Sequence, residues 1–144
     1  MKETVMSWIQ SEGNNEDMGK LVLRFTIGFL MLFHGVHKVV HGVSFIEGML
    51  VNSGIPGIVA YGVYLSELLA PIMLIIGFRV KIASLLIIMT MLVAVGLTHA
   101  SDIFSLGKHG EWAIELQMFY ILGSVAIVLQ GAGKYSVDNY SKNA

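Results

Sequence analysis

Hydrophobic residues are gathered into four long runs, which short polar stretches separate. Each run is close to the ~20 residues that an α-helix needs to cross the hydrocarbon core of a bilayer. Because backbone N–H and C=O groups in lipid have to be satisfied within the segment, a helix is the natural structure for each run. The pattern therefore predicts an all-α protein, a four-helix transmembrane bundle. Its helices are expected over residues 19–40, 55–77, 81–100 and 113–131.

Polar segments flank these helices and set the expected domain boundaries. Residues 1–18 are expected to form an N-terminal tail, or a short interfacial helix with Trp8 at the headgroup level. Residues 19–133 form the membrane domain, and residues 134–144 form a polar, exposed C-terminal tail. The loop over 41–54 is expected to hold a short outer helix or a re-entrant piece. The turn "FRVK" makes the second and third helices antiparallel neighbours.

The distribution of lysine and arginine predicts the orientation of the bundle, because cytoplasmic loops carry an excess of both residues. With a cytoplasmic N-terminus, only Lys38 and Lys108 lie outside. The other cations then lie at or near the cytoplasmic side: Lys2, Lys20, Arg24, Arg79, Lys81, Lys134 and Lys142. We therefore expect both termini to be cytoplasmic.

Composition agrees with a membrane protein and narrows the chemistry. The chain of 144 residues is 55% hydrophobic and only 13% charged, whereas an average soluble domain is about 25% charged. Its formal net charge of −1 provides no basic surface for nucleic acid. The absence of cysteine excludes disulfides, thiolate nucleophiles and cysteine-ligated metal centres, so a metal ligand has to be His, Asp or Glu.

Ionisable residues interrupt the apolar runs, and most of them fall in the outer half of the predicted bundle. Glu67 is the most informative, because a charge near the middle of a membrane helix costs roughly 2.5–3.5 kcal/mol and requires a partner, a proton or a function. Arg24 and His34 are its expected partners. The predicted pocket residues are His34, Lys38, Glu67, His99, Glu115, Arg24 and Tyr64.

The stretch "HGVHK" is expected to end the first helix as one wall of an outer-half pocket. Gly35 and Lys38 share a stripe of that helix, and the glycine lets a neighbouring helix approach closely. Lys38 would then neutralise Glu115 or hold a ligand oxygen, while His37 lies at the rim. Snorkelling of Lys38 to the interface is the alternative. In the second segment, Pro71 follows the buried carboxylate by one turn and removes a backbone hydrogen bond there.

Several motifs, in this order, resemble the DoxX family of small bacterial membrane proteins. They are Arg24, "HGVHK", "SGIPG", "SELLAPIMLIIGFRVKIAS", "THA" and the closing "GAGKYSVD", and they span nearly the whole chain after Asp17. The resemblance implies a multi-pass protein of the bacterial cytoplasmic (inner) membrane. It also implies a setting of quinone-coupled thiosulfate oxidation, terminal-oxidase gene clusters, or oxidative-stress and quinone-responsive operons. A family does not fix a substrate, because function depends on the site.

A quinone-linked redox role, as an oxidoreductase subunit, is the first functional hypothesis. His34, His99 and Lys38 would donate hydrogen bonds to the quinone carbonyls, while Glu67 and Glu115 would relay protons. The rings expected to flank the quinone are those of Tyr61, Tyr64 and Phe33. Because the chain itself carries no electron-transferring group, this role requires a bound cofactor or a redox partner subunit.

Two other classes of function remain open. A metal-binding protein would use His34, His99 and Glu115 as ligands for zinc or copper, and haem held by the two histidines is a variant of this hypothesis. The third class is a non-catalytic membrane scaffold or a small-molecule transporter subunit. The lipid bilayer is the partner that the composition implies, and a homo-oligomer is compatible with every class.

Overall fold

The computed structural model describes residues 4–7 and 12–143, with the side chains of the longer segment described from residue 15 onward. Its regular elements are helical, and an isolated β-bridge joins Leu106 to Trp112. After a single helical turn over 4–7, the elements are α2 (Glu12–His41), α3 (Ser44–Asn52), η1 (Gly57–Gly62), η2 (Leu65–Leu69), α4 (Ala70–Ile76), α5 (Val80–Thr98), η3 (Ala100–Asp102), α6 (Glu115–Gln130) and α7 (Val137–Asn143). The predicted all-α class is confirmed.

Three helical segments are long and apolar enough to cross a membrane: Asn15–His41, Gly57–Ile76 and Val80–Thr98. The fourth apolar helix, Glu115–Gln130, is shorter. At about 1.5 Å per residue it is shorter than the ~30 Å hydrocarbon core of a typical bilayer. The chain is thus a multi-pass membrane protein, with the predicted helices close to their expected positions.

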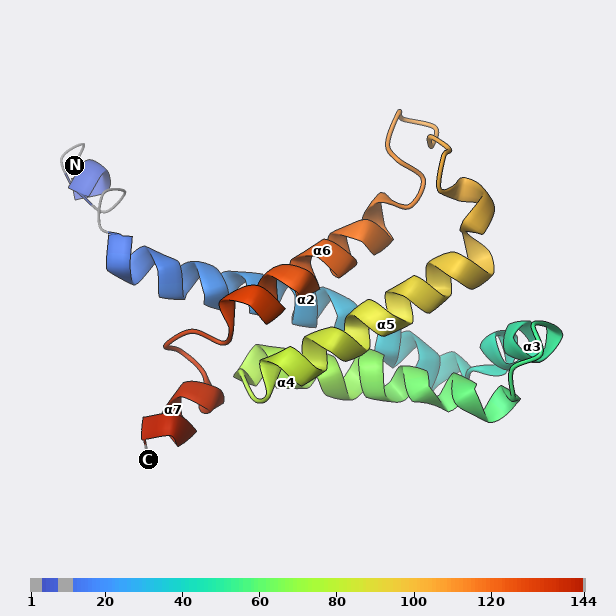
Figure 1. Cartoon of the computed structure of the whole chain (residues 1–144), viewed down its shortest axis with the longest axis horizontal. Helices are drawn as coiled ribbons and strands as arrows, with labels where there is room; N and C mark the ends of the chain where they lie inside the picture. Colours follow the sequence, from blue (N-terminus) through green and yellow to red (C-terminus); the bar gives the residue numbers. More distant parts are fainter. Residues whose placement is uncertain (1–3, 8–11, 144) are drawn as a thin grey trace.

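The core lies where α2, α4, α5 and α6 pack against one another, and the outer faces of the helices are apolar. In Figure 1, α2 crosses α6 and α4, while α5 lies between α4 and α6. The buried side chains at this contact include Ile27, Met31, Leu74, Ile87, Tyr120 and Ile127. Large apolar side chains also point outward, among them Phe29, Leu85, Leu92, Phe119 and Leu122. Such an exposed apolar surface is the one that lipid covers.

The second membrane segment is not the continuous α-helix predicted over 55–77. It begins as the 3₁₀-helix η1, continues through η2 as a π-helical turn, and becomes α-helical only in α4. Pro71 is one cause, because it has no N–H to donate to the carbonyl of Glu67, four residues earlier. In the π turn, the N–H of Ala70 reaches back five residues, to the carbonyl of Leu65.

The two ends of the described chain lie at the same end of the molecule. α2 begins and α7 ends on the left of Figure 1, while α3 and the loop before α6 lie on the right. The predicted exposed tail over 134–144 is only partly exposed, because it folds back and forms α7. Helix α2 begins at Glu12 instead of residue 19. The predicted interfacial position of Trp8 lies outside the described residues.

The C-terminal segment is held against the turn between α4 and α5. The Asp138 carboxylate accepts hydrogen bonds from the backbone N–H groups of Arg79 at 2.7 Å and Val80 at 3.2 Å. It therefore caps the beginning of α5, where backbone N–H groups have no partner within the helix. The N–H of Asp138 in turn donates to the carbonyl of Gly77 at 2.9 Å. Asp138 thus ties the closing motif to the turn before α5.

Candidate functional site

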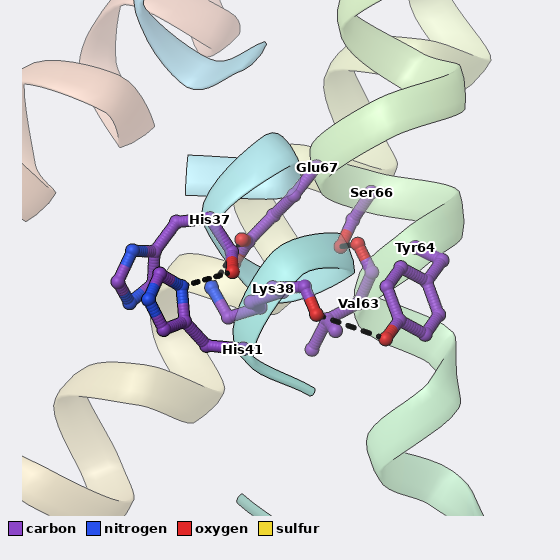
Figure 2. Close-up of polar contacts among 7 residues, drawn as sticks. All are labelled: His37, Lys38, His41, Val63, Tyr64, Ser66 and Glu67. Atoms are coloured by element: carbon purple, nitrogen blue, oxygen red, sulfur yellow. Dashed lines mark hydrogen bonds and ion pairs between the residues drawn. The ribbon is translucent and has the colours of Figure 1, made fainter. Parts of the chain in front are cut away.

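The charged centre of the candidate site is an ion pair between Lys38 and Glu67. Figure 2 shows the Lys38 ammonium directed at the Glu67 carboxylate, which comes from the neighbouring helical segment. The side chain of Glu67 is only 5% exposed and that of Lys38 is 20% exposed. Tyr64 lies beside the pair, and its hydroxyl donates to the backbone carbonyl of Lys38 at 3.2 Å. Two polar contacts therefore join α2 to the segment around η2.

Lys38 and Glu67 are brought together because α2 packs closely against the segment around η2 at Gly35, one turn before Lys38. A Cβ atom at Gly35 would collide with the backbone carbonyl of Glu67, so only glycine allows this approach. At Gly28, two turns deeper, a Cβ would lie 2.7 Å from the carbonyl oxygen of Pro71. Glycines at spacing seven thus let α2 lie directly on the irregular backbone before and around the proline. The predicted role of Gly35 in close approach is confirmed.

The predicted partners of Glu67 were wrong, although the prediction that it needs a partner is confirmed. Arg24 lies deeper in α2, and its guanidinium donates to the carbonyls of Leu74 at 3.1 Å and Tyr135 at 2.6 Å. Lys38 occupies the partner position instead. Lys38 consequently does not neutralise Glu115, and it is not simply a residue that snorkels to the interface.

A cavity of about 480 Å³ opens beside the ion pair. Lys38, Ser66 and Glu67 lie on its polar wall, while apolar side chains from α3, η1 and α5 form the rest. The apolar and small residues of the lining are Phe45, Ile46, Met49, Leu50, Val59, Ala60, Gly62, Val63, Leu65, Leu86, Met89, Val93, Ala94 and Leu97, with Thr90 and Thr98 among them on α5. An apolar cavity with a few polar groups at one wall is the usual form of a small-molecule site.

The histidines of "HGVHK" lie outside this cavity. His34 is exposed toward α6, where its ring meets the Tyr120 ring edge-on with centroids 5.9 Å apart. His37 and His41 are exposed, stack on each other at 4.1 Å, and share a contact of 3.0 Å from His41 Nδ1 to the His37 carbonyl. Figure 2 places this stacked pair beside the Lys38–Glu67 pair. His37 does not line the cavity, so its predicted position at a pocket rim is not confirmed.

His99 and Glu115 are not brought to Lys38. His99 follows α5, and its Nδ1 lies 3.1 Å from Oδ2 of Asp102 in the adjoining loop. Glu115 is exposed in the first turn of α6. Neither residue lines the cavity. Across the part of the chain that the structure describes, no three His, Asp or Glu side chains are close enough to hold a metal ion, so His34, His99 and Glu115 do not form a ligand set.

Sequence reasoning missed the largest part of the cavity wall. The short helix α3 covers one side, with Leu50 only 3% exposed against η1 and α5 residues. Ser66 and Thr98 were not proposed as site residues either, although both line the cavity. Thr98 stands in the "THA" motif that carried part of the family resemblance, and Ser66 precedes the buried glutamate. These two positions, within a family motif and next to a buried carboxylate, are the sequence features that could have identified Thr98 and Ser66 as site residues.

Comparison with known families decides the classification. The DoxX family model matches residues 19–100, which is more than half of the chain. The chain belongs to the DoxX family. The match runs from the membrane part of α2 to the first residue of η3. It therefore contains both partners of the ion pair and every residue that lines the cavity beside them. No curated protein and no solved structure matches the chain.

Proposed function

We propose that this DoxX protein binds a lipid-soluble quinone, or a molecule with a similar carbonyl head, in the cavity beside Lys38 and Glu67. The observation that carries the proposal is the combination of a mostly apolar cavity of about 480 Å³ with one nearly buried ion pair on its wall. Its size falls within the ~300–1,000 Å³ common for ligand pockets. The apolar lining suits a ring and its substituents, and the polar wall suits their oxygen atoms.

Lys38 is the residue suited to hold a carbonyl oxygen. An ammonium has three N–H donors, and the hydrogen bond of Lys38 to the Glu67 carboxylate uses one of them. The remaining donors can reach an oxygen in the cavity, where water is scarce and such a hydrogen bond is strong. The Tyr64 hydroxyl bonds to the Lys38 carbonyl and so fixes the helix end that carries the ammonium.

Glu67 is the residue suited to exchange a proton with the ligand. Its carboxylate is held next to Lys38 in a position that is 4% exposed, and it lies on the cavity wall, where it can exchange a proton with a bound ligand. A bound quinone would supply the electron-accepting chemistry, and a partner subunit would supply the electrons. The protein is then a quinone-linked or oxidative-stress-associated subunit, in agreement with the family setting.

The membrane arrangement follows from the same reasoning. We propose a four-helix bundle in the bacterial inner membrane, with α6 as its fourth member and with both termini cytoplasmic. The concentration of Lys and Arg at the end where α2 begins and α7 ends supports this orientation. The cavity then lies in the outer half of the membrane, on the side of α3.

Purification in mild detergent, followed by solvent extraction and mass spectrometry, tests the function. The wild-type protein is expected to carry quinone in a fixed molar ratio. Ala94→Trp places a large ring in the cavity and should abolish this retention. Leu92→Trp is the matched control, because Leu92 lies on the same helix, is 57% exposed and points away from the cavity.

Equal quinone retention by the two tryptophan variants would refute the proposed cavity. Absence of any lipid-soluble carbonyl compound from the wild-type extract, and no binding of added quinone, would favour the scaffold or transporter hypothesis instead. Thermal unfolding of both variants in detergent checks that each is folded before its extract is compared.

A further inference from the structure

A second cavity, of about 860 Å³, lies at the opposite end of α5 from the quinone site. It is formed where α5 begins, α6 ends and α7 folds back. Its lining is polar and charged over much of its extent, and it includes Asp17, Arg79, Lys81, Ile82, Asp138 and Lys142. Nothing in the proposed quinone chemistry uses these residues.

We call this second cavity the basic cavity, because its carboxylates have hydrogen-bond partners within the protein while its cations do not form ion pairs among the residues whose side chains are described. Both acidic side chains already accept backbone N–H groups: Asp138 from the first residues of α5, and Asp17 from Lys134 at 3.0 Å. The three cations Arg79, Lys81 and Lys142 are exposed. Among the residues whose side chains are described, none of them forms an ion pair. The cavity therefore offers cationic donors to an anion while its carboxylates are turned toward the protein backbone.

Apolar surface adjoins these cations. Ile82 lines the cavity and is 48% exposed on the outer face of α5, next to Lys81. One turn further along the same helix, Leu85 is also exposed and does not line the quinone cavity. A ligand with an anionic head and a long apolar tail would match both features, with its head among the cations and its tail along α5.

We propose that this basic cavity binds the phosphate headgroup of an anionic phospholipid. Basic pockets between membrane helices on the cytoplasmic side are suited to anionic headgroups, and this cavity lies at the end of the molecule that the Lys and Arg distribution places there. Lys81 and Lys142 hold the phosphate from two elements, α5 and α7, while Arg79 adds a third charge. Such a lipid ties the C-terminal helix to the membrane domain.

Native mass spectrometry of the delipidated full-length protein in detergent measures this binding. Phosphatidylglycerol is expected to bind more tightly than phosphatidylcholine, and rising salt should weaken the binding. Lys81→Gln and Lys142→Gln should each weaken phosphatidylglycerol binding roughly fivefold, since one cation near a membrane surface contributes a factor of that order. Lys81→Arg, which retains the charge, should bind like wild type. Lys108→Gln is the matched control, because Lys108 is exposed in the loop at the other end of α5.

Three results would overturn the proposal. The first is equal binding of the two lipids by wild type. The second is unchanged phosphatidylglycerol binding by both glutamine variants. The third is displacement of phosphatidylglycerol by inorganic phosphate at a similar concentration, which would make the site one for a free phosphate and not for a lipid. The quinone content of the Lys81→Gln protein should stay that of wild type, which keeps this test separate from the first site.

Discussion

Replacing Lys38 and Glu67 singly and together is the most direct test of the site. Lys38→Met removes the ammonium and leaves the Glu67 carboxylate, with a side chain only 5% exposed, without its partner. Glu67→Leu leaves the ammonium, whose side chain is 20% exposed and can move toward the membrane surface. Lys38→Met/Glu67→Leu removes both charges and fills the space with apolar groups of similar length.

The expected loss in the free energy of unfolding depends on how deeply the remaining charge is buried. Breaking a buried ion pair by removing one partner costs roughly 3–5 kcal/mol, whereas replacing both partners by apolar residues is often neutral. We expect the loss of stability in Lys38→Met to lie in the upper part of that range, because the Glu67 that it leaves unpaired has little access to water. The loss in Glu67→Leu should lie in the lower part. The double variant should lie within about 1 kcal/mol of wild type, so the two effects are strongly non-additive.

Reversible unfolding in mixed detergent micelles, followed by circular dichroism, gives the free energy of unfolding for the four proteins. Lys108→Met is the control for loss of a lysine, and as an exposed substitution it should change that free energy by no more than about 0.5 kcal/mol. If the double variant loses the sum of the two single losses, the residues act independently. The reasoning also fails if either single variant loses less than about 1 kcal/mol.

Three further predictions test the surroundings of the site. Gly35→Ala should destabilise the protein by roughly 1–3 kcal/mol in the same unfolding assay, because its Cβ collides with the Glu67 carbonyl. Gly96→Ala is the control and should not destabilise the protein, because a Cβ at Gly96 has no described neighbour within 4 Å. Asp138→Ala should cost about 1 kcal/mol through loss of the α5 cap and should speed hydrogen exchange at the first turn of α5, and unchanged exchange there would contradict the capping role. A cysteine at Ser105 should react with an impermeant thiol reagent added outside intact cells, whereas labelling only after permeabilisation would reverse the proposed orientation.

Sequence was informative wherever one segment's composition decides its structure. The third helix was expected over 81–100 and is Val80–Thr98, because an uninterrupted apolar run has no other way to satisfy its backbone in lipid. The stripe containing Gly35 and Lys38 was also read correctly, since α2 is a regular helix and its phase can be counted. The family resemblance was confirmed over residues 19–100, a range that leaves out the closing motif "GAGKYSVD".

The partner of Glu67 was predicted wrongly because the direction of its side chain depends on the number of residues per turn, which is not constant in this segment. Depth and direction were estimated for a continuous α-helix, but the 3₁₀-helix η1 precedes the glutamate and the π turn η2 contains it, and both change the number of residues per turn. The wall made by α3 and the placement of His99 relative to Glu115 depend on how loops fold back. No periodicity records such long-range packing, so the sequence singled out Lys38 and Glu67 but did not pair them with each other.

The packing of α2 and the polar wall of the cavity have a common origin in Pro71. The proline leaves the carbonyl of Glu67 without its usual helical donor, and that carbonyl lies where α2 presents Gly35 instead of a side chain. The close approach then places Lys38, one turn further along α2, next to the Glu67 carboxylate. One glutamate thus contacts α2 through both its backbone and its side chain, and a shift of either helix at Gly35 changes the geometry of the ion pair. A change in helix packing is therefore transmitted directly to the carboxylate on the wall of the cavity.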